Sequence, residues 1–198
     1  MQGRTKKSLV VILEPKGNTT YTYICLKLNE MNKSIEALLN DQIKYEANAS
    51  MHYMAMASWS DAAGYNGIAE FFYAQSEEER AHMTKLIKFV NERGGKVLVP
   101  AVEKPKESYV SLNELFEDFL KSEMFVTEQI NHVIYECLNK KDYNVHNFMQ
   151  WYVTEQLEEE AVARTLLDKL NIIGDDKSGH YMFDRDINTI ATSVDMEE

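Results

Sequence analysis

The segment Ser76-Glu77-Glu78-Glu79-Arg80-Ala81-His82-Met83 decides the fold, because it places ionisable side chains where a helix should be apolar. Around it, apolar residues recur at steps of three and four, the spacing of one face of an α-helix. Glu79 and His82 fall on this face, one turn apart. A buried carboxylate without a counter-charge is costly. The segment therefore predicts a helix whose buried face meets a source of positive charge.

Three further stretches show the same periodicity and extend the pattern outward. The four predicted long helices cover residues 34–61, 67–92, 112–139 and 143–171. A short fifth helix is expected at about 182–191. The long connection between the second and third helices contains Pro100 and Pro105, and it can run the length of a bundle. The predicted fold class is all-α, a four-helix bundle with a long crossover between helices two and three and a short fifth C-terminal helix.

Local breakers set the predicted helix boundaries. Gly64 and Gly67 are expected to form the first turn. The glycines that follow the second and fourth helices are expected to end them; they are Gly94, Gly95 and Gly174. The pattern Ser111-x-x-Glu114 predicts a capping box, in which each residue's side chain bonds the other's backbone, at the start of the third long helix.

The first thirty residues differ from the rest of the chain. Residues 10–13 and 21–28 are β-branched and aromatic, which predicts two short strands or a loose tail. The helical period begins after Met31. We interpret residues 1–30 as an N-terminal extension outside the core fold, and residues 31–198 as the folded domain.

Composition excludes several classes of protein. The formal net charge is −11, which argues against nucleic acid as a partner and favours attraction of cations. No apolar run reaches the roughly 18 residues of a membrane span. The two cysteines form no CxxC pair, so reduced thiols and a cytoplasmic location are expected.

Each predicted long helix carries ionisable residues near the middle of its apolar seam. The first and third helices contribute Glu46 and Glu123. The fourth offers Gln156-x-x-Glu159 where a symmetric di-iron bundle would have Glu-x-x-His. No lysine or arginine occurs in these seams near that level. A metal is therefore the expected counter-charge.

The spacing predicts two cation positions. One would be bound by Glu46, Glu79 and His82. The other would share Glu79 as a bridge with Glu123 and Glu159. Mixed oxygen and nitrogen ligands with open coordination positions suit iron better than structural zinc.

These residues resemble those of the bacterial non-haem ferritins over about residues 39–191. The segment 76–83 and the segment 148–160, Phe-Met-Gln-Trp-Tyr-Val-Thr-Glu-Gln-Leu-Glu-Glu-Glu, carry the resemblance most strongly. The resemblance implies a ferritin-like bundle and a homo-oligomeric shell of twenty-four subunits around an iron mineral. It also implies a ferroxidase centre that oxidises Fe(II) with oxygen or hydrogen peroxide.

The resemblance also assigns roles to further residues. Gln156 lies close to the second iron, and Tyr53 matches a tyrosine near the centre that donates an electron or a hydrogen bond. Plain core packing is the alternative for Tyr53. Residues matching a third iron position are Glu78, Glu155, Glu158 and Glu159. Simple exposure on the inner wall is the alternative for the first three of these.

Two other functions remain open at this point. One is a non-storage di-iron oxidase or peroxidase of the same superfamily. The other is a non-catalytic cage whose acids nucleate mineral. No haem is expected, because the methionines suit packing better than ligation.

Overall fold

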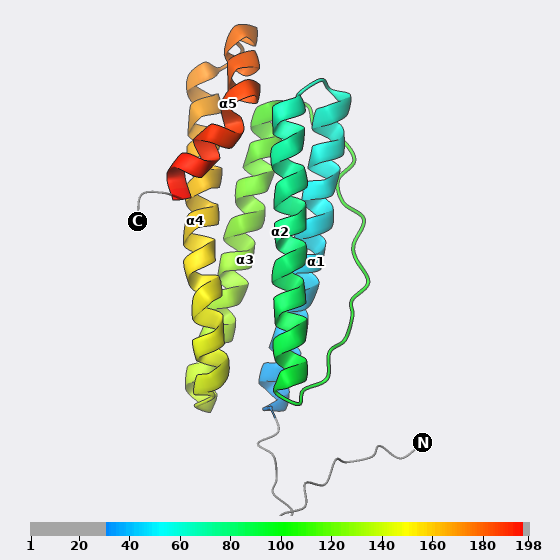
Figure 1. Cartoon of the computed structure of the whole chain (residues 1–198), viewed down its shortest axis with the longest axis vertical. Helices are drawn as coiled ribbons and strands as arrows, with labels where there is room; N and C mark the ends of the chain where they lie inside the picture. Colours follow the sequence, from blue (N-terminus) through cyan, green and yellow to red (C-terminus); the bar gives the residue numbers. More distant parts are fainter. Residues whose placement is uncertain (1–30, 196–198) are drawn as a thin grey trace, which may run out of the picture. The chain divides into compact units, whose positions relative to one another are not determined.

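The computed structural model describes residues 31–195, which form a bundle of four long helices with a fifth helix at one end (Figure 1). The helices are α1 (Lys33–Ala62), α2 (Asn66–Glu92), α3 (Leu112–Lys140), α4 (Tyr143–Ile173) and α5 (Lys177–Asp195). No strand occurs within residues 31–195. The all-α prediction is confirmed, and the four long helices begin within one residue of their predicted starts.

Short polar residues begin most of the helices, and of these caps only Ser111 is predicted from the sequence. The Asn32 side chain accepts a hydrogen bond from the Ser34 amide at 2.9 Å at the start of α1. Ser111 Oγ accepts from the Glu114 amide at 3.1 Å, and Asp142 Oδ1 accepts from the Val145 amide at 3.2 Å. These caps satisfy amides that the first turn of a helix leaves without partners.

Helix α2 obtains its cap from a different element. Its own N-cap residue, Tyr65, makes no side-chain capping bond. Instead, Asp184 of α5 accepts a hydrogen bond from the Ile68 amide at 2.9 Å. Gly67 permits this approach, because a Cβ there would lie 1.8 Å from the Asp184 carbonyl oxygen. The docking of α5 therefore depends on a glycine in the first turn of α2.

Three boundary expectations need correction. Gly67 is not part of the first turn but lies inside α2, while Gly64 occupies the turn with a φ of 87°. The Glu114 side chain completes its cap by accepting from the Val110 amide at 2.7 Å, one residue before the predicted partner. The fifth helix has 19 residues and is longer than predicted, because it already begins at Lys177, where Asp176 accepts hydrogen bonds from the Ser178 and Gly179 amides at 3.3 and 3.0 Å.

Other predictions fall on parts of the chain that the structure leaves undescribed. The strands predicted at residues 10–13 and 21–28 lie outside the described residues, so the N-terminal extension stays a prediction. Among the described helices, none is both long and apolar enough to cross a membrane.

The crossover between α2 and α3 follows α1 and connects opposite ends of the bundle, so α3 runs parallel to α2 (Figure 1). Side chains of α1 hold its backbone. The Asn40 amide group donates to the Lys96 carbonyl at 3.0 Å and accepts from the Leu98 amide at 2.7 Å. Asn48 accepts from the Glu103 amide at 3.0 Å. The predicted one-crossover topology is confirmed.

The interior consists of two apolar clusters separated by a polar layer. The first cluster, here the α5 cluster, includes Tyr53, Met56, Phe72, Phe116, Phe119, Leu166, Phe183 and Ile187. The second, here the Met31 cluster, includes Met31, Ile35, Leu39, Ile43, Leu86, Val90, Ile130, Val133 and Met149. The buried residues between them, here the polar layer, are Gln42, Glu46, Glu79, His82, Glu123, Gln156 and Glu159. All four long helices contribute to this layer.

Candidate metal centre

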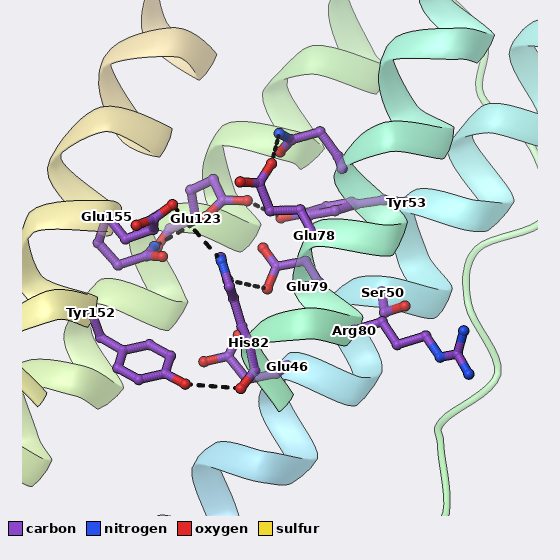
Figure 2. A network of polar contacts seen from close by, with 12 residues as sticks. Glu46, Ser50, Tyr53, Glu78, Glu79, Arg80, His82, Glu123, Tyr152 and Glu155 are labelled. Atoms are coloured by element: carbon purple, nitrogen blue, oxygen red, sulfur yellow. Dashed lines mark hydrogen bonds and ion pairs between the residues drawn. The ribbon is translucent and has the colours of Figure 1, made fainter. Parts of the chain in front are cut away.

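The polar layer brings carboxylates from different helices to one level of the bundle (Figure 2). Helix α1 contributes Glu46, α2 contributes Glu79 and His82, and α3 contributes Glu123. Each lies on the inward face because it continues an apolar seam of period three and four. Glu46 and Glu79 are 1% exposed and Glu123 is fully buried. These groups are therefore far too buried to be satisfied by bulk water.

Glu46, Glu79 and His82 form the tightest group. Each offers a ligand atom, and these atoms lie within 4.8 Å of one another. The His82 Nδ1 atom lies 3.4 Å from Glu79 Oε2. This is the set of three residues that the sequence predicts for the first cation.

Among the described residues, three of the four carboxylate oxygens in this group have no hydrogen-bond donor. While both are ionised, as they would be beside a cation, Glu46 and Glu79 only accept hydrogen bonds, so neither can satisfy the other. Both oxygens of Glu79 and Oε2 of Glu46 are buried without a hydrogen-bond partner among the described residues. The other oxygen of Glu46 accepts from Gln42 Nε2 at 2.9 Å. A cation between the two carboxylates would satisfy the buried oxygens.

Electrostatics support the same conclusion. The pKa of Glu79 is raised well above its usual range, first by burial and then by the charges of Glu46, Glu123 and Glu159. Burial also raises the pKa of Glu46. The four carboxylates are thus close enough to destabilise one another's charge, and a bound cation would lower these pKa values.

His82 is suited to metal binding in a different way. Burial, and secondarily the charge of Lys85, lowers the pKa of His82 to about 4. The imidazole is therefore neutral near pH 7, with a lone pair available to a metal. The His82 ring makes T-shaped contacts with the rings of Trp151 and Tyr152, and the Tyr152 hydroxyl donates to the His82 carbonyl at 2.8 Å. These contacts fix the ring between α2 and α4.

Glu123 has partners that Glu79 does not have. The Tyr53 hydroxyl donates to Glu123 Oε1, and Gln156 Nε2 donates to Glu123 Oε2 at 3.0 Å. Burial raises the pKa of Glu123 to about 7, although these two hydrogen bonds act in the opposite direction. Glu123 and the buried Glu159 lie outside the tight group of Glu46, Glu79 and His82.

A second group of possible ligands shares His82. Glu78, His82 and Glu155 offer atoms within 4.8 Å of one another, and His82 Nε2 lies 3.9 Å from Glu155 Oε1. Figure 2 shows Glu155 of α4 opposite His82 of α2. Glu78 and Glu155 are more exposed than His82. Glu158, which the resemblance also places at a third cation, is partly buried on α4 and lies outside this group.

Several supporting contacts were not evident from the sequence. Ser50 Oγ donates to the Ser76 carbonyl at 2.8 Å, and Ser76 Oγ donates to the Ser50 carbonyl at 2.7 Å. This reciprocal pair joins α1 to α2 beside the centre. Lys85 brings a positive charge near His82 from outside the seam. Its position three residues after His82 is the one sequence feature that points to it.

Comparisons with known proteins agree with this geometry. The family model described as "Ferritin-like domain" matches residues 36–173. The chain is 38% identical to a probable bacterial non-heme ferritin-like protein of Haemophilus influenzae, covering 83% of this chain and 99% of that protein. It is 39% identical to the bacterial non-heme ferritin of Campylobacter jejuni, covering 82% and 98%.

A solved structure shares the fold. The open pore ferritin of the archaeon Archaeoglobus fulgidus superposes with a TM-score of 0.79 at 36% identity, covering 80% of this chain and 96% of that one. The matched region includes every residue of the polar layer on all four long helices. The chain therefore belongs to the ferritin family.

Proposed function

We propose that this protein stores iron and oxidises it, converting Fe(II) to Fe(III) at the polar layer and depositing the product as a mineral inside a shell. The observation that carries the proposal is the convergence of Glu46, Glu79 and His82 around buried carboxylate oxygens that lack donors. A buried arrangement of this kind is costly for a protein without a cation. Family membership supports iron as that cation.

The substrate iron would occupy two neighbouring positions. Glu46, Glu79 and His82 hold the first Fe(II). Glu79 bridges to the second, which Glu123 and Glu159 hold with Gln156 nearby. A third position would use Glu78, Glu155, Glu158 and Glu159, on the way to the mineral. The burial of the first five ligands and the shared histidine of the two groups support this order.

The reaction balances when two irons react together. Two Fe(II) ions give up one electron each. Together with two protons, these two electrons reduce either O₂ to hydrogen peroxide or hydrogen peroxide to two waters. Carboxylate oxygens stabilise the higher charge of Fe(III). The chain's part is to hold both ions at one depth, exclude bulk water and keep His82 unprotonated. Tyr53 holds a proton against Glu123 and is positioned to donate a hydrogen bond or an electron.

The relatives named ferritin support assembly into a cage-like oligomer, and we propose twenty-four identical subunits in the cytoplasm, with a role in iron homeostasis. A non-storage di-iron oxidase or peroxidase is the second candidate, since the polar layer alone would serve either function. Light scattering distinguishes them, because a discrete dimer would favour the oxidase and a very large particle the store.

Stopped-flow oxidation of Fe(II) tests the centre. The double variant E46A/H82A should slow the fast oxidation phase by more than about a hundredfold, because it removes two of three ligands. The matched control is E77A, which removes an exposed acid from the same helix. Unchanged rates in E46A/H82A would refute the site. Normal assembly without a fast phase in the wild-type protein would indicate a non-catalytic cage.

Electron microscopy after aerobic Fe(II) loading tests storage. Filled shells are expected in the wild-type protein. Particles that stay empty after complete oxidation would contradict storage while leaving the oxidation centre intact.

A further inference from the structure

Lys85 places a positive charge beside the second group of possible ligands. It follows His82 by one turn on α2, and its Nζ atom lies over the indole ring of Trp151 on α4, 2.7 Å from the ring centroid. The same atom is 5.7 Å from the centroid of the Tyr152 ring. Both aromatic residues also contact the His82 imidazole. Lys85 is therefore held between α2 and α4 by contacts that also position a proposed iron ligand.

The charge of Lys85 reaches both His82 and Glu155. It contributes to lowering the pKa of His82, while Glu155 stabilises the protonated form of Lys85 against partial burial. Glu155 is four residues after Trp151, so it lies one turn further along the same face of α4. In the metal-free protein the ammonium group thus offsets part of the negative charge that Glu78 and Glu155 bring to His82.

We propose that Lys85 is a positioning residue that weakens cation binding by Glu78, His82 and Glu155, so that a cation arriving there is passed on and not retained. The inference rests on the proposed function and assigns Lys85 a role in iron transfer. Without a cation, the ammonium group is a favourable neighbour of Glu155. Once a divalent cation binds, the same ammonium becomes a like charge that repels it.

The aromatic contacts keep the Lys85 ammonium group close to the site while a cation binds. A lysine on an exposed helix face can swing into solvent when a cation approaches, and its repulsion is then screened. Lys85 is partly buried and is attracted by the faces of Trp151 and Tyr152. Moving away would cost these cation–π contacts. Lys88, one turn later on α2, is exposed and offers a natural comparison.

Titration with Co(II), an air-stable probe for Fe(II) sites, tests the proposal through calorimetry and the visible absorption of bound Co(II). K85Q and K85M both remove the charge and keep a long side chain, so one of them remains informative if the other folds poorly. In both, the weakest of the specific Co(II) sites should tighten by about tenfold. K85R should bind as the wild-type protein does, and so should K88Q.

The outcomes separate this inference from the proposed function. Tight binding of two Co(II) ions with no difference between K85Q, K85M and K88Q would overturn the role of Lys85 alone. Equal tightening in K85Q and K88Q would also overturn it, because net charge would then explain the effect. Absence of tight Co(II) binding in every variant, including the wild-type protein, would overturn both. Tightening confined to K85Q and K85M supports the proposal.

Discussion

The polar layer and the two apolar clusters beside it occupy the same bundle but are completed in opposite ways. In the α5 cluster, Phe116 contacts the rings of Phe72, Phe119 and Phe183 and is fully buried. In the polar layer, Glu79 is equally buried but both its oxygens lack donors among the described residues. The clusters need nothing beyond the chain, whereas the layer needs a cation. We infer that the apolar clusters stabilise the metal-free protein and that the polar layer destabilises it.

The largest effect should come from damage to an apolar cluster. F116A should lower the free energy of unfolding of the metal-free protein by about 3–5 kcal/mol, because it removes a buried ring and leaves a cavity. Urea denaturation in the presence of a chelator measures this loss. F116L, which keeps more of the volume, should cost clearly less. A loss below about 1 kcal/mol in F116A would contradict the comparison.

A bound metal ion should stabilise the folded protein, and it should do so only through the polar layer. At about a hundred times its Kd, Zn(II) should raise the free energy of unfolding by about 3 kcal/mol, since it binds the folded chain preferentially. Thermal unfolding with and without Zn(II) checks the increment. F116A should keep the full increment and E46A/H82A should lose it. The same increment in E46A/H82A would show that Zn(II) binds elsewhere.

The pH dependence of the metal-free protein should also arise in the layer. The folded-state pKa of Glu123 is about 7, against an ordinary value of 4.5. Between these values the folded state holds more protons than the unfolded chain, so stability falls as pH rises. The contribution of Glu123 is on the order of 3 kcal/mol across this window, present below pH 4.5 and lost above 7.

His82 acts in the opposite direction, because its folded-state pKa of about 4 lies below the ordinary 6.5. Both the wild-type protein and E123Q retain His82, so the difference between them cancels its contribution and leaves that of Glu123 together with its effect on Glu79. Urea denaturation from pH 4.5 to 7.5 should show the wild-type protein losing stability relative to E123Q. Parallel curves would mean that Glu123 titrates normally.

The smallest effect is a gain of stability from removing a ligand. E79Q should stabilise the metal-free protein by about 1–3 kcal/mol, because it replaces a carboxyl group, whose charged form is disfavoured by burial and by the neighbouring carboxylates, with a neutral amide. The same variant should lose fast Fe(II) oxidation. Urea denaturation gives the first result and stopped-flow absorbance the second. E77Q, an exposed change on the same helix, should alter neither. Destabilisation by E79Q would indicate that the layer is stable without a cation.

The fold could be predicted largely because its determinants are local. Ser111 and Asp142 begin helices through bonds to residues three positions away, and Gly94 and Gly174 adopt positive φ at helix ends. Such features are visible in any single stretch of sequence. The cap that Asp184 gives to α2 was not predictable, since it joins residues 116 positions apart.

The candidate centre also contains residues that the sequence could predict and contacts that it could not. Glu46, Glu79 and His82 follow from helical periodicity, because inward-facing positions of a bundle converge at equal depth. The roles of Glu123, Glu159 and the third group remain predictions. The Ser50–Ser76 pair and the placement of Lys85 over Trp151 depend on how two helices are rotated and shifted against each other. Periodicity in one helix does not specify that relation.

The anchoring of the crossover by α1 has a practical consequence for protein engineering. Asn40 and Asn48 fix the crossover backbone at Lys96, Leu98 and Glu103. The route of the crossover is therefore set mainly by side chains of α1. The exposed residues Glu107 and Ser108 lie beyond these anchors. A foreign epitope grafted between them should be displayed without disturbing the bundle, provided that both asparagines are retained.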